Sequence, residues 1–232
     1  MSKKSKKANK NDKKNGKNKK KKKGFLVFLL ILLLVGALCW YLFIYSKPTK
    51  KKVRVEIEVL DKLDDYGYSL SDNDSDLYKT EFEKLKEIVN ADKFVEEDYV
   101  NQVAKLFVID LYTMSTKTNL YDVGGREFFY ADKVEMFEKK VMDSLYSTLL
   151  DNTYGDRKQE LPEVSSITIE STEKTTYKLG SKSVDGYLIK LKWTYKKDMG
   201  YDDEGSIVIC KEEEPRWSVV DYQPTLKPEY EK

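Results

Sequence analysis

The clearest pattern along the chain is an unbroken apolar run at residues 25–45, which directly follows a lysine-dense stretch. As a helix, these 21 residues would be about 31 Å long, which matches the roughly 30 Å hydrocarbon core of a membrane. A helix satisfies its backbone polar groups internally, as a segment surrounded by lipid must. The pattern therefore predicts a transmembrane helix. The side chains expected to anchor it in lipid include Phe25, Leu30, Leu34, Trp40 and Tyr45.

Beyond a linker around Pro48, the pattern changes to a period of two. Apolar residues at positions 53, 55, 57 and 59 alternate with charged residues at 54, 56 and 58. This alternation predicts a short strand or an extended stalk that leaves the membrane. The following residues 61–76 are rich in Asp, Ser, Asn and Gly, which is typical of a loop.

Further along, helical spacing gives way to strand alternation. Apolar stripes with helical spacing cover residues 77–90, 96–114 and 132–150. Alternating patterns typical of strands cover residues 164–177, 186–197, 205–211 and 217–222. Because the connections between these strands are short, they should form an antiparallel meander. The sequence therefore predicts an α+β fold, with about three helices packed on a four-stranded antiparallel sheet.

This order of elements, with the closing residues RWSVVDYQ at 216–223, resembles the nuclear-transport-factor-like (cystatin-like cone) superfamily. The resemblance covers about residues 96–223 and implies a curved sheet that the helices close into a cone. A short tail, one membrane crossing and such a domain also resemble the inner-membrane assembly subunits of type IV secretion and conjugation systems. The segments YGYSL (66–70), DVGG (122–125) and WTYKKDMGY (193–201) resemble uncharacterised membrane-anchored proteins of low-GC Gram-positive bacteria.

Charge differs sharply between the two sides of the apolar run. Residues 1–24 hold 13 lysines and one aspartate, a net charge of +12, whereas the rest of the chain holds 29 basic and 39 acidic residues, a net charge of −10. Positively charged flanks are retained in the cytoplasm. We therefore expect a cell-membrane protein with a cytoplasmic N-terminus. The expected parts are a disordered Lys-rich tail (1–24), the transmembrane helix (25–45), a stalk (46–76), an extracytoplasmic α+β domain (77–224) and a C-terminal tail (225–232).

Two alternatives concern the N-terminal part. A cleaved signal peptide is the first, although its apolar region is usually only about 7–15 residues long and ends in small residues. The second concerns the lysine tail, which either binds anionic lipid or nucleic acid, or only sets the topology. The external domain is acidic, and nucleic-acid binding needs a basic face, so no nucleic-acid partner is expected for it.

Few residues carry catalytic or metal-binding chemistry. The chain has no histidine, which is the commonest general base and zinc ligand, and its two cysteines, Cys39 and Cys210, lie in different parts. The acidic run at 72–76, with Glu83, approaches the spacing of a calcium loop, but Leu77 stands where such a loop needs glycine. A helix cap at Ser75 or Asp76 explains the same residues. No metal, no cofactor and no catalytic residue are expected.

Four residues are candidates for binding a small ligand. Asp110 lies in an apolar stretch, where it could act as a general base with Tyr112 or Tyr130 as a donor; alternatively it faces solvent or caps loop N–H groups. Trp193 either lines a cavity or packs in the core. The glycine pair at 124–125 lacks the context of a nucleotide-binding loop and predicts a turn with positive φ.

The sequence favours a non-enzymatic single-pass membrane protein whose external domain mediates protein contacts. Its expected partners are membrane lipid and an unidentified protein, which includes a second copy of the chain. One alternative is a small-ligand-binding or isomerase-like cone domain that uses Asp110 and a tyrosine. Another is a component that assembles a secretion or conjugation system.

Overall fold

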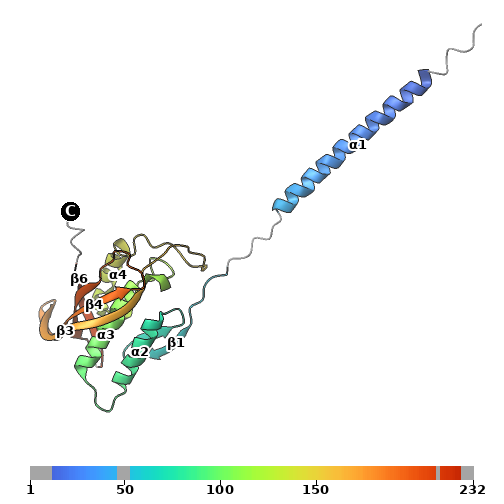
Figure 1. The fold of residues 1–232 in the computed structure, drawn as a ribbon. Coiled ribbons are helices and arrows are strands. Elements are labelled where there is room, and N and C mark those ends of the chain that lie inside the picture. The colour runs from blue at the N-terminus through green and yellow to red at the C-terminus, as the bar shows by residue number, and fades with distance from the viewer. Residues whose placement is uncertain (1–11, 46–52, 213–214, 226–232) are drawn as a thin grey trace, which may run out of the picture. The chain divides into compact units, whose positions relative to one another are not determined.

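The computed structural model describes residues 12–45, 53–212 and 215–225 of the 232-residue chain (Figure 1). The chain divides into two compact units, Met1–Lys52 and Val53–Lys232. In its described part, the first unit is a single helix, α1 (Asp12–Tyr45). The second unit contains a β-hairpin, three further α-helices and a four-stranded sheet.

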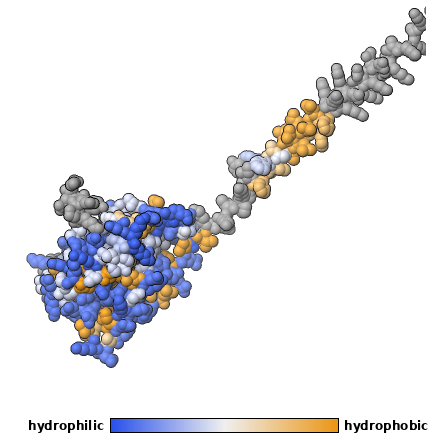
Figure 2. Space-filling model, in the orientation of Figure 1, coloured by the Kyte–Doolittle hydropathy of each residue, from blue (hydrophilic) through white to orange (hydrophobic). Residues whose placement is uncertain are grey.

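Helix α1 contains the apolar run. Its stretch Phe25–Phe43 is long and apolar enough to cross a membrane, and it is the one such helix in the part of the chain that the structure describes. The side chains of this stretch are all exposed, as Figure 2 shows by the orange band along the helix. Exposed apolar side chains all around a helix fit a lipid environment. A signal sequence near an N-terminus can also pass this test of length and composition.

The second unit begins with a hairpin and a capped helix. Strands β1 (Val59–Leu63) and β2 (Tyr68–Ser71) pair antiparallel. Helix α2 (Asp76–Val89) follows, and the Ser75 hydroxyl accepts a hydrogen bond from the Tyr78 backbone N–H at 3.2 Å. This contact satisfies one of the amide groups that a helix start leaves without a partner.

Helix α3 (Glu96–Tyr112) is the centre of the core. Eleven of its 17 residues are buried, because it packs against α2 on one side and against the sheet on the other. Short 3₁₀ turns, η1 (Met114–Thr116), η2 (Arg126–Phe128) and η3 (Ala131–Lys133), lead to α4 (Val134–Asp143). The connection is anchored at the sheet, where the Tyr130 N–H donates to the Val219 carbonyl at 2.9 Å.

The sheet is an antiparallel meander in the order β3-β4-β5-β6 (Figure 1). Its strands are β3 (Val164–Leu179), β4 (Lys182–Tyr195), β5 (Glu204–Lys211) and β6 (Trp217–Pro224). On β4, Ile189, Leu191 and Trp193 are buried, whereas Lys190 and Lys192 are exposed. This alternation packs one face of the strand in the core and leaves the other in water. β3 and β4 are long and curve strongly in Figure 1.

The predicted α+β fold with a four-stranded antiparallel sheet is confirmed. The β1–β2 hairpin was not predicted, and it lies within residues that the sequence suggested were stalk and loop. Its Tyr68 and Leu70 are buried in the core of the domain. The predicted helix over 132–150 is also shorter, because α4 ends at Asp143. Beyond Asp143 the chain forms a turn that contains the buried Tyr146. The Tyr146 hydroxyl donates to the carbonyl of Leu111 on α3 at 2.8 Å.

Candidate functional site

The sequence-predicted ligand residues Asp110 and Tyr112 are not brought together by the fold. Both are on α3, and residues two positions apart on a helix point roughly 200° away from each other. Asp110 lines a small polar pocket, and Tyr112 lines a larger apolar one. The two pockets are called the Asp110 pocket and the α4 pocket below.

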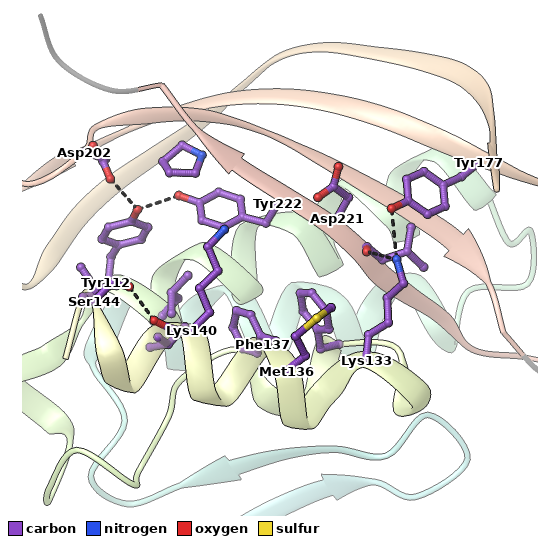
Figure 3. Close-up of a pocket in the computed structure, with 16 residues that line it drawn as sticks. Tyr112, Lys133, Met136, Phe137, Lys140, Ser144, Tyr177, Asp202, Asp221 and Tyr222 are labelled. Carbon is purple, nitrogen blue, oxygen red and sulfur yellow. Dashed lines mark hydrogen bonds between the residues drawn. The ribbon is translucent and has the colours of Figure 1, made fainter. Parts of the chain in front are cut away.

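The α4 pocket lies between α4 and β6 and has a volume of about 560 Å³ (Figure 3). Its walls include Phe129, Phe137, Val141 and Val220, which are all buried in the domain. The rings of Phe129 and Phe137 stack with centroids 4.2 Å apart, which stiffens one wall. Met136 stands at the opening with 69% of its surface exposed. The pocket is therefore an apolar hollow that is open to solvent.

A hydrogen-bonded tyrosine pair closes one end of the α4 pocket. The Tyr222 hydroxyl donates to the Tyr112 hydroxyl at 2.7 Å, and Tyr112 donates to Asp202 Oδ2 at 3.1 Å. Burial raises the pKa of both tyrosines well above the usual value, so both stay protonated near neutral pH. Figure 3 shows this chain of contacts at the end of the pocket that faces Asp202. Its donors are already used within the domain.

Two lysines of the α4 pocket have different surroundings. Lys133 donates to the Tyr177 hydroxyl and the Val220 carbonyl, both at 3.1 Å, and so ties the far end of β3 to the region before α4. Lys140 forms no ion pair with any residue that the structure describes, and in Figure 3 it extends from α4 toward Tyr222. Lys140 is therefore the ammonium group available to a bound ligand.

Trp193 and Tyr130 lie near the α4 pocket without lining it. The Trp193 ring is buried, lies 5.0 Å from the Tyr112 ring, and donates through Nε1 to the Tyr195 hydroxyl at 2.8 Å. Tyr130 is half-buried beside Phe129 and contributes the backbone bond to β6 already described. Of the four predicted ligand residues, Tyr112 is thus the one that lines the α4 pocket.

Asp110 lies on the other side of α3, in a polar pocket of about 230 Å³. Its carboxylate pairs with Lys117 and accepts a hydrogen bond from the Gly125 N–H at 2.6 Å. Burial alone would lower the pKa of Lys117, but Asp110, Tyr146 and Asp122 together outweigh burial and raise it. The half-buried Asp110 thus pairs with the buried Lys117 and caps a loop N–H group, which is one of the alternatives noted above for Asp110.

The glycine pair explains how Asp110 meets the loop. Gly125 has a φ of +77°, as the sequence predicted for this turn. At Gly124, a Cβ atom would lie 2.1 Å from the Asp110 carbonyl oxygen. A larger residue cannot fit there, so glycine permits the close approach between the loop and α3.

Two further carboxyl groups of the Asp110 pocket have a raised pKa: Asp74, from the acidic run at 72–76, and Glu127, which was not singled out from the sequence. Glu127 accepts hydrogen bonds from the Ser69 N–H, the Ser69 hydroxyl and the Tyr78 hydroxyl, the last two at 2.9 Å. Burial, with a contribution from Asp110, raises the pKa of Glu127 to about 7. Burial likewise raises the pKa of Asp74 to about 6. Glu127 lies in a loop with no periodic pattern, so no sequence signal marks it.

The acidic run at 72–76 serves the local structure. Asp72 Oδ1 accepts from the Glu58 N–H at 3.1 Å, and Asp74 Oδ2 accepts from the Ser71 N–H at 2.7 Å. Ser75 caps α2, which was the alternative to a calcium loop. Glu83 pairs with Lys86 on the same helix. These contacts account for the acidic residues as turn and cap groups.

Chemically, the two pockets offer different possibilities. Carboxyl groups with a pKa near 7 can exchange protons at neutral pH, as general acids and bases do. In the Asp110 pocket, however, Asp110 and Glu127 each already hold two chain segments together, and Asp74 is bonded within its own turn. The α4 pocket has apolar walls, and two charged side chains of its lining, Lys140 and Asp221, form no ion pair with any residue that the structure describes. An apolar hollow with a few polar groups suits binding.

Comparisons with protein-family models, with curated proteins and with solved structures found no match. The resemblance to the nuclear-transport-factor-like superfamily therefore stays an expectation from the sequence. A function for this chain has to be argued from the geometry of its own residues. The α4 pocket, with its apolar walls and its opening to solvent, is the feature that best suits ligand binding in the described part of the second unit.

Proposed function

We propose that this chain is a single-pass membrane protein whose external domain is a non-enzymatic binding domain. In this proposal, α1 is the retained anchor, and the α4 pocket receives apolar side chains of a protein partner. The observation that carries the proposal is the open apolar pocket of about 560 Å³ with an available lysine at its edge. Each part of the proposal has separate support.

The anchor is supported by length and by charge. The stretch Phe25–Phe43 exceeds the 7–15 apolar residues of a usual signal peptide, and 13 lysines precede it. Lysines in a short flank hold that flank in the cytoplasm, so the larger unit would be outside. External protease on intact cells should digest the C-terminal unit, and alkaline carbonate should leave the chain in the membrane. A protected or extractable C-terminal unit would contradict this topology.

The partner chemistry follows from the pocket. Well-packed apolar and aromatic side chains supply most of the binding energy at protein interfaces, and they need a hollow that excludes water. Phe137, Val141 and Val220 form such a hollow. Lys140, which has no acidic partner in the described part of the chain, favours an acidic residue beside the inserted side chain. We therefore expect a partner segment with one or two large apolar residues next to Asp or Glu.

Site-specific crosslinking in intact membranes tests this proposal. A benzophenone amino acid replaces Met136 at the opening of the pocket, and in a control chain it replaces Glu135, which is exposed on α4 outside the pocket. We expect one defined protein adduct from position 136 and none from position 135. Lys140→Glu should reduce the adduct, whereas Lys139→Glu should not, because Lys139 pairs with Asp143. Equal adducts at both positions, or none, would refute the pocket as a docking site.

A small apolar carboxylate is a second candidate ligand. The pocket volume lies within the 300–1,000 Å³ typical of small-molecule sites, which favours this alternative. If it is correct, dodecanoate should shift the Met136 methyl resonance, Lys140→Gln should weaken the effect, and dodecylamine should have little effect. An unchanged methyl resonance at saturating dodecanoate would exclude it.

A further inference from the structure

The residues just before β1, 53–57, form an exposed segment that lies outside any helix or strand and leads directly into β1, and apolar and charged side chains alternate along it (Figure 1). Val53 and Ile57 are 79% and 40% exposed, and Val55 between them is also exposed. None of these residues lines the α4 pocket. An exposed apolar segment in extended conformation is a template for pairing with another strand.

The two edges of the 53–57 segment differ in their backbone hydrogen bonds. Successive residues of an extended chain point their N–H and C=O groups to alternate edges. On one edge, the Val55 N–H donates to the Thr153 carbonyl at 2.8 Å. On the other edge, Glu58 is bonded to Asp72, beyond the end of β2. Arg54 and Glu56 share that edge, and their backbone groups bond to no other residue in the described ranges.

We propose that this available edge pairs antiparallel with the same edge of a second copy of the chain, with Val55 opposite Val55. In this register, Arg54 of each copy lies opposite Glu56 of the other, and Val53 lies opposite Ile57. Arg54 and Glu56 exchange the backbone hydrogen bonds, and the apolar side chains meet on one face. The interaction surface is therefore a five-residue strand on each copy.

Charge selects this register over its neighbours. A shift by two residues in one direction places Glu56 opposite Glu56, and a shift in the other places Arg54 opposite Arg54. Like charges directly opposite each other destabilise a strand pair. A shift by one residue would place valines opposite charged residues. Within residues 53–57, the register centred on Val55 is the one that forms two opposite-charge pairs and places every apolar residue opposite another apolar residue.

Membrane anchoring favours such pairing. Residues 46–52 give each copy up to about 24 Å of chain between α1 and the segment, enough for two segments to meet side by side. Tethering turns a weak contact into an effectively intramolecular one. The pairing itself involves no residue of the α4 pocket. The pairing can therefore be absent while the pocket binds a partner, and the pocket can fail to bind while the pairing forms.

Disulfide trapping in native membranes tests the register. In a Cys39→Ser background, where the remaining Cys210 is buried, Val55→Cys should form a disulfide-linked dimer on mild oxidation. Opposed residues of this kind lie about 4.5 Å apart between Cα atoms, within the range of a disulfide. Ile57→Cys alone should stay monomeric, because the two copies of position 57 would be roughly 14 Å apart. Val53→Cys mixed with Ile57→Cys should again give a dimer.

Charge reversal provides the matched control. Arg54→Glu and Glu56→Arg, each in the Val55→Cys chain, should lose the crosslinked dimer, and the double reversal should restore it. These side chains are exposed, so circular dichroism should be unchanged. Equal crosslinking at positions 53, 55 and 57, or no rescue by the double reversal, would overturn the proposal. A Val55→Cys chain that stays monomeric on oxidation would also overturn the proposal. Protection of this cysteine from a water-soluble maleimide in that chain would show that the segment lies against lipid instead.

Discussion

The α4 pocket and the Asp110 pocket lie on different sides of α3, and they differ in how their polar groups are satisfied. In the α4 pocket, aromatic and aliphatic walls surround an open hollow, and Lys140 has no acidic partner in the described chain. In the Asp110 pocket, Asp110, Lys117 and Glu127 all bond to groups of the domain.

This difference teaches which residues to associate with binding and which with stability. Removing the partner of a buried, hydrogen-bonded polar group destabilises the fold, so such a bonded pair stabilises the domain. When an apolar group of a ligand fills an apolar hollow that is open to water, the free energy falls, so the filling is favourable. We therefore expect substitutions in the Asp110 pocket to change unfolding, and substitutions at the opening of the α4 pocket to change binding.

The largest effect is expected from Lys117→Met. This substitution removes the buried ammonium group that pairs with the half-buried Asp110 carboxylate. Breaking a fully buried ion pair typically costs about 3–5 kcal/mol, so a loss of about 3 kcal/mol is expected here. Urea unfolding of the detergent-solubilised chain, followed by tryptophan fluorescence, measures the loss. The double variant Asp110→Asn/Lys117→Met should recover part of it. A Lys117→Met chain of unchanged stability would show that the ion pair does not stabilise the domain.

Gly124→Ala should be next in size. Its Cβ would lie 2.1 Å from the Asp110 carbonyl oxygen, so the loop must move away from α3, at a cost of about 1–3 kcal/mol. Gly180→Ala is the control, because Gly180 has a φ of +61° but no atom within 4 Å of its Cβ position. Its cost of about 1 kcal/mol would reflect backbone conformation alone. Equal losses for the two variants would remove the argument for close approach.

Acidification should stabilise the domain between pH 8 and pH 5. The pKa of Glu127 is raised in the fold to about 7, so the folded chain holds this proton more tightly than the unfolded chain. The resulting stability is complete below the unfolded pKa of about 4.5 and is lost as the pH rises through about 7. Asp74, with a pKa of about 6, acts in the same direction.

The pH effect of Glu127 can be isolated by one substitution. Glu127→Gln cannot titrate, so the stability of this variant should change less between pH 8 and pH 5, by about 1–3 kcal/mol. Melting temperatures at the two pH values measure the difference. Glu83→Gln, at an exposed position of α2, should keep the full pH dependence. If Glu127→Gln behaved like the unmodified chain, Glu127 would not be the titrating group.

The smallest effect on stability is expected from Met136→Glu. Met136 is 69% exposed at the opening of the α4 pocket, and surface substitutions of this kind change the free energy of unfolding by about 0.5 kcal/mol or less. Partner crosslinking from a benzophenone at Ser144, which also lines the pocket, should nevertheless be lost, since the carboxylate introduced at position 136 would face the apolar hollow. A large loss of stability would show that Met136 stabilises the fold, and it would weaken the contrast between the two pockets.

Local patterns in the sequence were sufficient to predict the apolar helix, α3, the four strands and the positive φ at Gly125. Each depends on residues within a few positions of one another, whose spacing records which face is buried. The β1–β2 hairpin was missed because its polar residues resemble a loop, and its buried Tyr68 is revealed only by packing. The end of α4 was likewise decided by the contact of Tyr146 with α3.

The amino-acid sequence by itself determined that this chain has a membrane-length apolar helix and an α+β unit. Only the tertiary structure decided which polar residues meet: Glu127 bonds Ser69 from 58 positions away, and Tyr112 reaches Asp202 from 90 positions away. It also separated Asp110 from Tyr112, which are neighbours in the sequence but face different sides of one helix. The physical reason is that periodicity reports burial, whereas a binding pocket is formed by contacts between distant residues.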